Sequence, residues 1–162
     1  MKAKIILFFL MILAMGSLAQ AIWLDFNDGL ALVKKTGKPM IVDFYTDWCH
    51  WCKVMDEETF ENKQVKSFLD KYFIMVRILA EDKQAFINYK GKKLNNVEFT
   101  RALGINGFPS MLFIDKSGEP ITVLPGFIPA EHFLPILKYI QKECYRKQMS
   151  FKDFLKKQEE CQ

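Results

Sequence analysis

Short apolar runs alternate with helical stripes along the chain, and their order indicates the fold class. Met40–Tyr45 and Phe73–Leu79 are apolar runs of strand length, and we interpret both as buried strands. Two more such runs, Ser110–Asp115 and Pro120–Leu124, lie on either side of the Gly-containing segment Lys116–Glu119. This pattern predicts a β-hairpin.

The segments between these strands carry helical patterns. Trp23–Lys35 predicts a strand fragment followed by a helix, which Gly37-Lys38-Pro39 ends. A second helix should begin near Cys49, and a short one is expected at Val97–Leu103. Between them, an apolar helical stripe is formed by Val65, Phe68, Leu69 and Tyr72. The intervening segment Asp82–Asn96 is polar and is expected to be a loop insertion.

The last third of the chain predicts two more helices. One apolar helical face consists of Phe133, Ile136, Leu137, Ile140 and Cys144. Pro135 falls within this helix, so it should occupy the first turn or bend the helix. Ser150 and Asp153 resemble a capping box for a short C-terminal helix. The whole order predicts an α/β fold with a central mixed β-sheet flanked by helices.

The first residues have the three-part pattern of an export signal. Lys2 and Lys4 precede the apolar run Ile5–Met15, and small residues follow, ending in Ala19-Gln20-Ala21. We expect residues 1–21 to be a signal peptide, which leaves residues 22–162 as one domain in the periplasm. A retained N-terminal anchor is the alternative, although the apolar run is short for a membrane span.

Composition and charge limit the number of domains and the kinds of partner that the chain can have. The chain has 162 residues, half of them hydrophobic, which is enough for one domain with a core and too few for two. Loss of Lys2 and Lys4 with the signal would lower the net charge from +4 to +2. Such a weak positive charge predicts no nucleic-acid partner. Four cysteines in an exported chain are compatible with two disulfides.

The candidate chemistry lies in Trp48-Cys49-His50-Trp51-Cys52-Lys53, which directly follows a predicted strand and opens a predicted helix. Backbone N–H groups at a helix start stabilise a thiolate, and only the thiolate attacks a disulfide. This position makes Cys49 the candidate nucleophile. Cys52, one turn deeper, would be shielded and would resolve the mixed disulfide.

A CxxC motif has three other uses in proteins. A zinc site needs a second ligand pair, and the spacing of Cys144 and Cys161 does not provide one. Attachment of a c-type haem needs His directly after the second cysteine, where Lys53 stands. A permanently oxidised, structural disulfide stays open. The redox interpretation needs no metal and no cofactor.

Two further features support a redox site. Asp43 lies in the middle of an apolar strand, where burial of a carboxylate is costly, and it could exchange a proton with Cys52. The alternative is a strand-end Asp bonded to backbone. Phe108-Pro109 precedes a strand, where Pro is confined to an edge or a special turn. A cis bond there would be a deliberate feature, and an ordinary trans turn is the alternative.

These motifs carry a family resemblance. The stretch from Val42 to Lys53, together with Gly104-Ile105-x-Gly107-Phe108-Pro109-Ser110, resembles thioredoxin-fold proteins. The resemblance is greatest to the C-terminal periplasmic domain of the thiol:disulfide interchange protein DsbD. Shared details include Glu58-Thr59-Phe60 and Gly126-Phe127.

The resemblance implies roles for individual residues. Cys49 would be the exposed nucleophile, Cys52 the resolving thiol and Asp43 the buried proton relay. Pro109 would be cis and lie beside the disulfide. Substrate would bind as an added strand against the backbone before Pro109, including Phe108, with Trp48 shaping the rim.

Other positions depart from the family or stay open. His50 and Trp51 replace the usual residues between the cysteines, and a cationic His50 would make the pair more oxidising. Arg77 stands where thioredoxins often carry a Lys near the buried Asp. His132 is expected to be a surface residue. Cys144 and Cys161 are either a structural disulfide or a buried thiol and a terminal one.

The function that follows is a monomeric, exported disulfide reductase. Its expected partners are disulfide-containing exported proteins and a membrane thiol–disulfide electron donor. The resemblance makes maturation of c-type cytochromes a candidate process. The alternatives are a disulfide oxidase or isomerase, and a non-catalytic binding module that kept a stable disulfide.

Overall fold

A computed structural model of the protein describes residues 23–161, so the expected signal peptide, residues 1–21, lies outside the described residues. From the start of the described chain through the second strand of the central sheet, the elements are α2 (Phe26–Thr36), β1 (Met40–Tyr45), α3 (His50–Met55), the π-helix η1 (Asp56–Phe60), α4 (Lys63–Tyr72) and β2 (Ile74–Leu79). The remaining elements are β3 (Phe86–Tyr89), β4 (Lys92–Asn95), α5 (Asn96–Ala102), β5 (Ser110–Ile114), β6 (Pro120–Pro125), α6 (Ala130–Gln141), the 3₁₀ helix η2 (Cys144–Lys147) and α7 (Phe151–Lys156).

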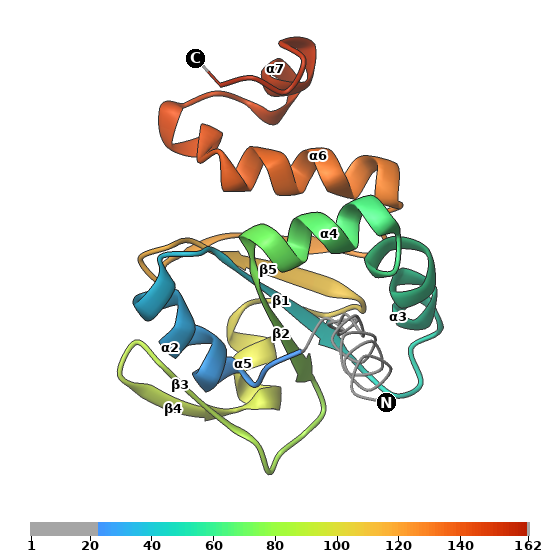
Figure 1. Ribbon diagram of the computed structural model, residues 1–162. Helices are drawn as coiled ribbons and strands as arrows, with labels where there is room; N and C mark the ends of the chain where they lie inside the picture. The colour runs from blue at the N-terminus through green and yellow to red at the C-terminus, as the bar shows by residue number, and fades with distance from the viewer. Residues whose placement is uncertain (1–22, 162) are drawn as a thin grey trace, which may run out of the picture.

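Four strands form one central mixed sheet in the order β2-β1-β5-β6 (Figure 1). β1 runs parallel to β2 and antiparallel to β5, which pairs antiparallel with β6. Leu24 adds a parallel bridge to Val76 on β2, which is the strand fragment that the sequence predicted. The mixed α/β sheet, the β5–β6 hairpin and the short C-terminal helix are all confirmed.

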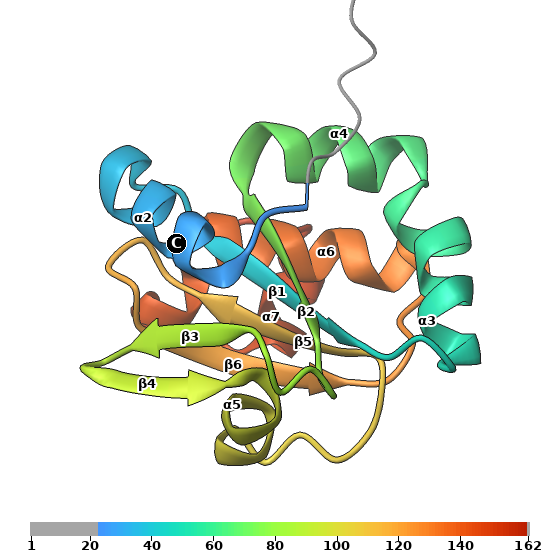
Figure 2. The same ribbon diagram turned by 90° about the horizontal axis from the view of Figure 1, so that it is seen from below.

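Each face of the sheet has its own apolar core, because alternate residues of β1 point to opposite faces. Met40, Val42 and Phe44 pack with residues of α2 and α5. Ile41 packs on the other face with residues of α3, α4 and α6, including Met55 of α3. Figure 2, seen from below, has α2, α5 and the β3–β4 pair in front of the sheet. By the same alternation, Asp43 faces the α3 side.

The approach of α2 to the sheet depends on Gly29. A Cβ atom there would lie 2.2 Å from Cγ2 of Val76 and 2.9 Å from Sδ of Met40. Both distances are below van der Waals contact, so any larger residue would push the helix away from β1 and β2.

The expectation that Asp82–Asn96 is a loop insertion is wrong. Residues within it form the antiparallel pair β3–β4, with Phe86 opposite Asn95 and Ile87 opposite Leu94. Lys90 and Gly91 both have positive φ, as a two-residue hairpin turn of type I′ requires. The pair lacks the regular alternation that would reveal strands, because Phe86 is exposed and Lys92 and Lys93 are exposed in succession. Ile87 is buried in the core that α2 and α5 cover, and Tyr89 and Leu94 pack partly against it.

The end of the chain differs from the expectation in two places. Cys144 lies in η2 and not on the face of α6, because Glu143 adopts a left-handed conformation just after α6 ends. Pro135 stands in the second turn of α6, so the first-turn alternative of that expectation is wrong. The predicted N-cap of α7 is present, since the N–H of Asp153 donates to Oγ of Ser150 at 3.1 Å. Among residues 23–161, no helix is long and apolar enough to span a membrane.

Candidate redox site

The site is built at the turn between β1 and α3, where Cys49 and Cys52 form a disulfide with Cα atoms 5.3 Å apart. Cys49 is the N-cap residue of α3, with an extended backbone. The N–H of Cys52 donates to Sγ of Cys49 at 3.0 Å. A sulfur that accepts a backbone N–H at a helix start is stabilised as a thiolate, so the bond distinguishes Cys49 from Cys52.

Exposure does not distinguish the two cysteines. Cys49 is 4% exposed and Cys52 is 5% exposed, so the expected contrast between an exposed and a shielded thiol is wrong for this oxidised form. The disulfide draws both side chains into the same turn, and neither sulfur protrudes. The asymmetry of the pair therefore rests on the hydrogen bond to Cys49.

Aromatic side chains surround the disulfide. The ring centroids of Trp48 and Phe108 are 6.3 Å apart, in an edge-to-face arrangement. Trp51 packs against Phe127 at 5.5 Å, and the His50 ring lies 5.6 Å from Trp51. The structure thus brings Phe108 to Trp48 and adds Phe127, which the sequence offered only as part of a family resemblance.

The loop before β5 contributes the proline. The Phe108–Pro109 peptide bond is cis. The carbonyl oxygen of Pro109 accepts the N–H of Gly126 at 2.8 Å, just after β6 ends. This bond joins the loop that carries Phe108 to the loop that carries Phe127.

Asp43 is buried in the centre of β1, with 1% of its surface exposed. Burial raises the pKa of its carboxyl to about 6, against the opposing effect of the Arg77 guanidinium. Oδ2 accepts a hydrogen bond from Nε of Arg77 at 3.0 Å and forms a salt bridge with its Nη2 at 2.9 Å. Oδ1 is buried and has no hydrogen-bond partner among the described residues. A buried carboxylate with one free oxygen, on the face that α3 covers, can accept a proton.

Arg77 connects Asp43 to the end of the active-site helix. It pairs across the sheet with Asp43 and also forms a salt bridge with Asp56, the first residue of η1. Its guanidinium lies 4.3 Å from the ring centroid of Trp23 and 5.1 Å from that of Tyr45. π-helical turns often occur at functional sites. Asp56 was not predicted, because it belongs to an acidic run, Asp56-Glu57-Glu58, that has no distinctive spacing.

The comparison with known proteins is consistent with this geometry. The family model described as a thioredoxin-like domain matches residues 26–141. The chain belongs to the thioredoxin-like family. Like the thiol–disulfide oxidoreductases of this family, it carries a CxxC pair, Cys49–Cys52.

Individual relatives agree with the family. The thiol:disulfide interchange protein DsbD of Shigella boydii is 35% identical over 106 residues, which are 64% of this chain and 17% of that protein. DsbD of Escherichia coli K12 is 34% identical over 106 residues, again 64% of this chain and 17% of that protein. The matched part of the chain therefore spans about a sixth of the length of these curated relatives.

Solved structures show the same fold. The C-terminal domain of Neisseria meningitidis DsbD in the oxidised form has a TM-score of 0.55 and 22% identity, covering 70% of this chain and 90% of that one. A DsbH oxidoreductase has a TM-score of 0.58 and 23% identity, covering 76% and 86%. A thioredoxin from Thermus thermophilus has a TM-score of 0.62 and 22% identity, covering 75% and 88%.

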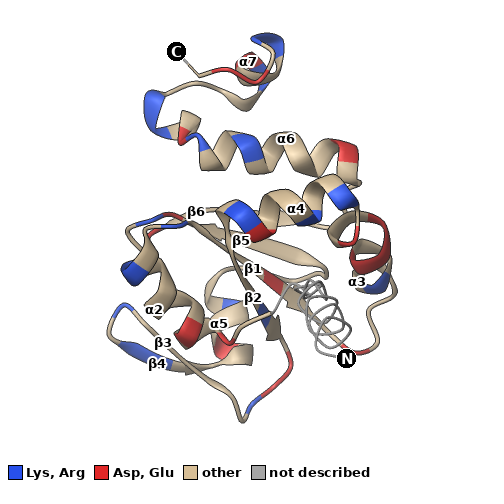
Figure 3. Cartoon of the chain, viewed as in Figure 1, with Lys and Arg blue, Asp and Glu red and all other residues tan. Residues whose placement is uncertain are grey.

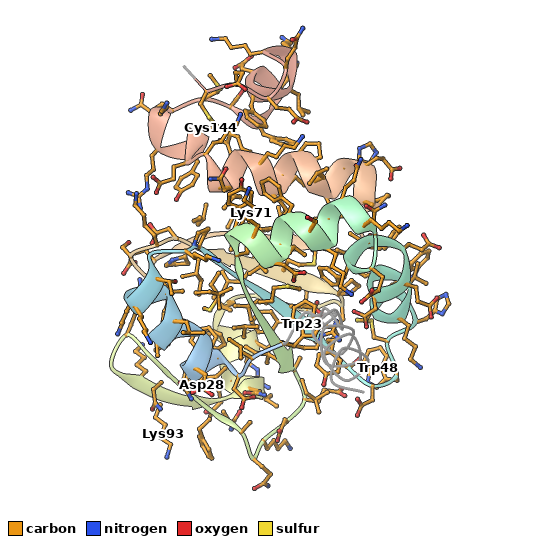
Figure 4. The ribbon with its side chains drawn as sticks, viewed as in Figure 1. Trp23, Asp28, Trp48, Lys71, Lys93 and Cys144 are labelled. Atoms are coloured by element: carbon orange, nitrogen blue, oxygen red, sulfur yellow. A yellow bond between two sulfur atoms is a disulfide. The ribbon has the colours of Figure 1, made fainter. Side chains whose placement is uncertain are left out.

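The remaining cysteines of this thioredoxin-like chain lie apart from the site. Cys144 and Cys161 form a second disulfide, with Cα atoms 5.6 Å apart. Figure 4 shows Cys144 above α6, on the far side of that helix from Trp48. His132 is exposed in the first turn of α6, as expected of a surface residue. Residues 23–161 contain no group of three or more potential metal ligands.

Proposed function

We propose that this thioredoxin-like protein is an exported reductase of protein disulfides. The observation that carries the proposal is the Cys49–Cys52 pair itself, placed at the start of α3 with the Cys52 N–H bonded to Cys49 Sγ. A buried carboxylate, Asp43, faces the same helix and has a raised pKa of about 6. Nucleophile, resolving thiol and proton acceptor are then all supplied by the chain.

The reaction would proceed by two thiol–disulfide exchanges. The Cys49 thiolate attacks one sulfur of the substrate disulfide, forms a mixed disulfide and releases the other sulfur as a thiolate, which takes a proton from water. Cys52 then loses its proton to Asp43 and attacks Sγ of Cys49. The second substrate thiolate leaves and takes up a proton, the substrate has gained two electrons, and the Cys49–Cys52 disulfide is restored.

A carboxyl with a pKa of about 6 suits this relay. At pH 7 most Asp43 side chains are ionised and can accept the Cys52 proton. The Arg77 guanidinium holds the pKa below the value that burial alone would produce, so the relay stays in its accepting form at neutral pH.

The direction of electron flow is tested by the reduction potential. We expect a value nearer that of thioredoxin, about −270 mV, than that of DsbA, about −120 mV. Equilibration with a glutathione redox buffer measures it, and an insulin reduction assay should show catalysis by the reduced protein. A potential near −120 mV would overturn the reductase and favour the oxidase.

One observation favours the oxidase as second candidate. His50 is the first residue of α3 and stands between the cysteines. A protonated His50 would stabilise the Cys49 thiolate, and with it the reduced protein, which makes the disulfide more oxidising. A binding module without redox activity is the other alternative, and it would reduce neither insulin nor oxidised glutathione.

Export is the third part of the proposal. It rests on Lys2, Lys4 and the apolar run Ile5–Met15 before Ala19-Gln20-Ala21. A periplasmic protein beginning at Ile22 would act on exported disulfide proteins, including those of c-type cytochrome maturation, and would receive electrons from a membrane thiol–disulfide donor. The mass of the protein from the periplasmic fraction tests the cleavage site, and recovery of only full-length chain in membranes would favour an anchor.

A further inference from the structure

Two exposed indoles border the buried disulfide, and the exchange chemistry uses neither of them. Trp48 directly precedes Cys49 and exposes 69% of its surface, and Trp51 directly precedes Cys52 and exposes 54%. A substrate that brings a sulfur atom to Cys49 must therefore approach between side chains that are far more accessible than the sulfur itself.

Each indole belongs to a ring pair. The first ring pair is Trp48 with Phe108, with centroids 6.3 Å apart. The second ring pair is Trp51 with Phe127, with centroids 5.5 Å apart and planes inclined by 31°. In both pairs, the Trp comes from the cysteine segment and the Phe from a loop at the end of a central strand.

The two ring pairs are held in a fixed relation to each other. Phe108 is joined to Pro109, whose carbonyl oxygen accepts the N–H of Gly126 at 2.8 Å, and Gly126 is joined to Phe127. The two indoles are in turn fixed by the Cys49–Cys52 turn. A substrate segment therefore meets a preformed surface.

The exposed parts of these rings are apolar. Nε1 of Trp48 donates to Oε2 of Glu81 at 2.9 Å, so its polar edge is already bonded within the protein. The Lys and Arg side chains that lie over aromatic rings in residues 23–161 contact other rings: Trp23, Tyr45, Tyr72, Phe86, Tyr89 and Tyr145. The His50 ring meets Trp51 edge-to-face, with centroids 5.6 Å apart. The other exposed surface of both ring pairs is available to an apolar ligand, since burial of aromatic surface is favourable.

We propose that the two ring pairs are side-chain subsites that select protein disulfides whose cysteine has apolar neighbours on both sides. The proposal rests on the reductase function above and names its substrate class. The occupant is an extended polypeptide segment, because it must deliver its sulfur to Cys49 and an apolar side chain to each ring pair at once. The surface is continuous with the reacting disulfide, which fixes where the substrate cysteine lies. A small charged disulfide such as oxidised glutathione covers neither ring pair.

The experiment compares two symmetric peptide disulfides with equivalent leaving thiols. Each is a dimer of a short peptide, in which the residues on both sides of Cys are Leu in one and Ser in the other. Stopped-flow fluorescence gives the second-order rate constant with which each oxidises the reduced protein. We expect the Leu peptide to react about tenfold faster, which corresponds to about 1.4 kcal/mol in the transition state.

Variants locate the preference. In Trp51→Ala the rate constant for the Leu peptide divided by that for the Ser peptide should fall from about ten to about two. Trp51→Phe should keep most of the preference for the Leu peptide. Trp48→Ala should lower it similarly. Phe86→Ala is the matched control, because Phe86 is also exposed, at 47%, but lies on β3 in the hairpin, and it should leave the ratio at about ten. Because the ratio compares two peptides on one variant, a change in thiol reactivity cancels.

Equal rate constants for the two peptides with the unmodified protein would overturn the selection. An unchanged ratio in both Trp variants would also overturn it, as would an equal loss in Phe86→Ala. Failure of the reductase itself gives a different result, since the reduced protein would then exchange with neither peptide and not with oxidised glutathione.

Discussion

Asp43 shows how one buried charge links stability to chemistry. Burial raises the pKa of its carboxyl from 3.8 to about 6, and Arg77 opposes the rise. In the unfolded chain this carboxyl would ionise near its ordinary value. The folded state therefore holds the proton of Asp43 more tightly than the unfolded chain does. As a result, this carboxyl makes the folded state more stable below pH 4 than at neutral pH. The relative stability is lost as the pH rises from about 4 to about 6.

The shift predicts a measurable change in Asp43→Asn. The difference between the pKa of Asp43 in the unfolded chain and in the folded protein corresponds to about 3 kcal/mol. At pH 7 the ionised Asp43 lowers the free energy of unfolding by about this amount. The variant lacks this titration. Its stability should therefore rise relative to the unmodified protein between pH 4 and pH 6.5, by up to about 3 kcal/mol. Urea unfolding across this pH range measures the difference, and a constant difference would contradict the assigned pKa.

Asp115→Asn is the control of opposite sign. Although burial raises the pKa of Asp115, hydrogen bonds from Ser117 and Glu119 outweigh it and hold the pKa below its ordinary value. That carboxylate stabilises the fold above pH 4, so its loss should destabilise the protein at neutral pH. In the insulin reduction assay, Asp43→Asn should slow turnover by about a hundredfold, because the acceptor for the Cys52 proton is gone.

At the residue level, the sequence predicted the reacting groups but not their surroundings. Cys49, Cys52 and Asp43 could be found because two thiols at a strand–helix turn and a charge in an apolar strand are unusual. The role of Asp56 could not be found, since it depends on Arg77 reaching across from β2. The nearly equal burial of the two cysteines depends on the closed disulfide, which a spacing rule does not describe.

At the level of elements, long apolar patterns were predictive and short amphipathic ones were not. β1, β2 and β5 are largely buried runs, β6 is a partly exposed edge strand, and the sequence places all four within one residue. The β3–β4 pair was missed because its turn is formed by Lys90 and Gly91 within a lysine-rich stretch, which is typical of a loop. The end of α6 was missed because a left-handed Glu143 ends it, where no Gly marks the stop.

The C-terminal segment is an element attached to the outer side of α6. Tyr139 packs against Phe151 and Phe154, with ring centroids 5.5 and 5.4 Å away. Lys138 forms a salt bridge with Glu159, and Lys142 forms one with Glu160. These contacts place α7 on α6 independently of the second disulfide.

Removal of that disulfide should therefore weaken the protein without changing its chemistry. The bond closes a sequence separation of 17 residues between Cys144 and Cys161. The chain-entropy model gives about 3 kcal/mol for a loop of this size. Cys161→Ser, chosen because Cys144 is fully buried, should lose about that much in urea unfolding and keep its insulin reductase activity. An activity loss larger than twofold at a temperature where the variant is folded would show that α7 takes part in function.

At the scale of the whole molecule, the surface beside the disulfide consists of aromatic rings. Basic and acidic residues are distributed over most elements, with an acidic run at η1 and two adjacent lysines on β4 (Figure 3). The disulfide is instead bordered by the two ring pairs. The sheet positions both halves of this surface. β1 leads to the cysteines, β5 begins just after the loop that carries Phe108, and β6 ends just before the loop that carries Phe127. Recognition by apolar contacts follows from this arrangement.

The account depends most on the division of labour between Cys49 and Cys52, and trapping of mixed disulfides tests it directly. In Cys52→Ser the backbone N–H that stabilises the Cys49 sulfur remains, so attack on substrate continues while resolution is lost. Incubation of each reduced serine variant with an oxidised protein substrate, followed by non-reducing electrophoresis, is the measurement. We predict a covalent adduct with Cys52→Ser that dithiothreitol removes, and none with Cys49→Ser. Equal trapping by both variants, or by neither, would contradict the assignment of nucleophile and resolving thiol.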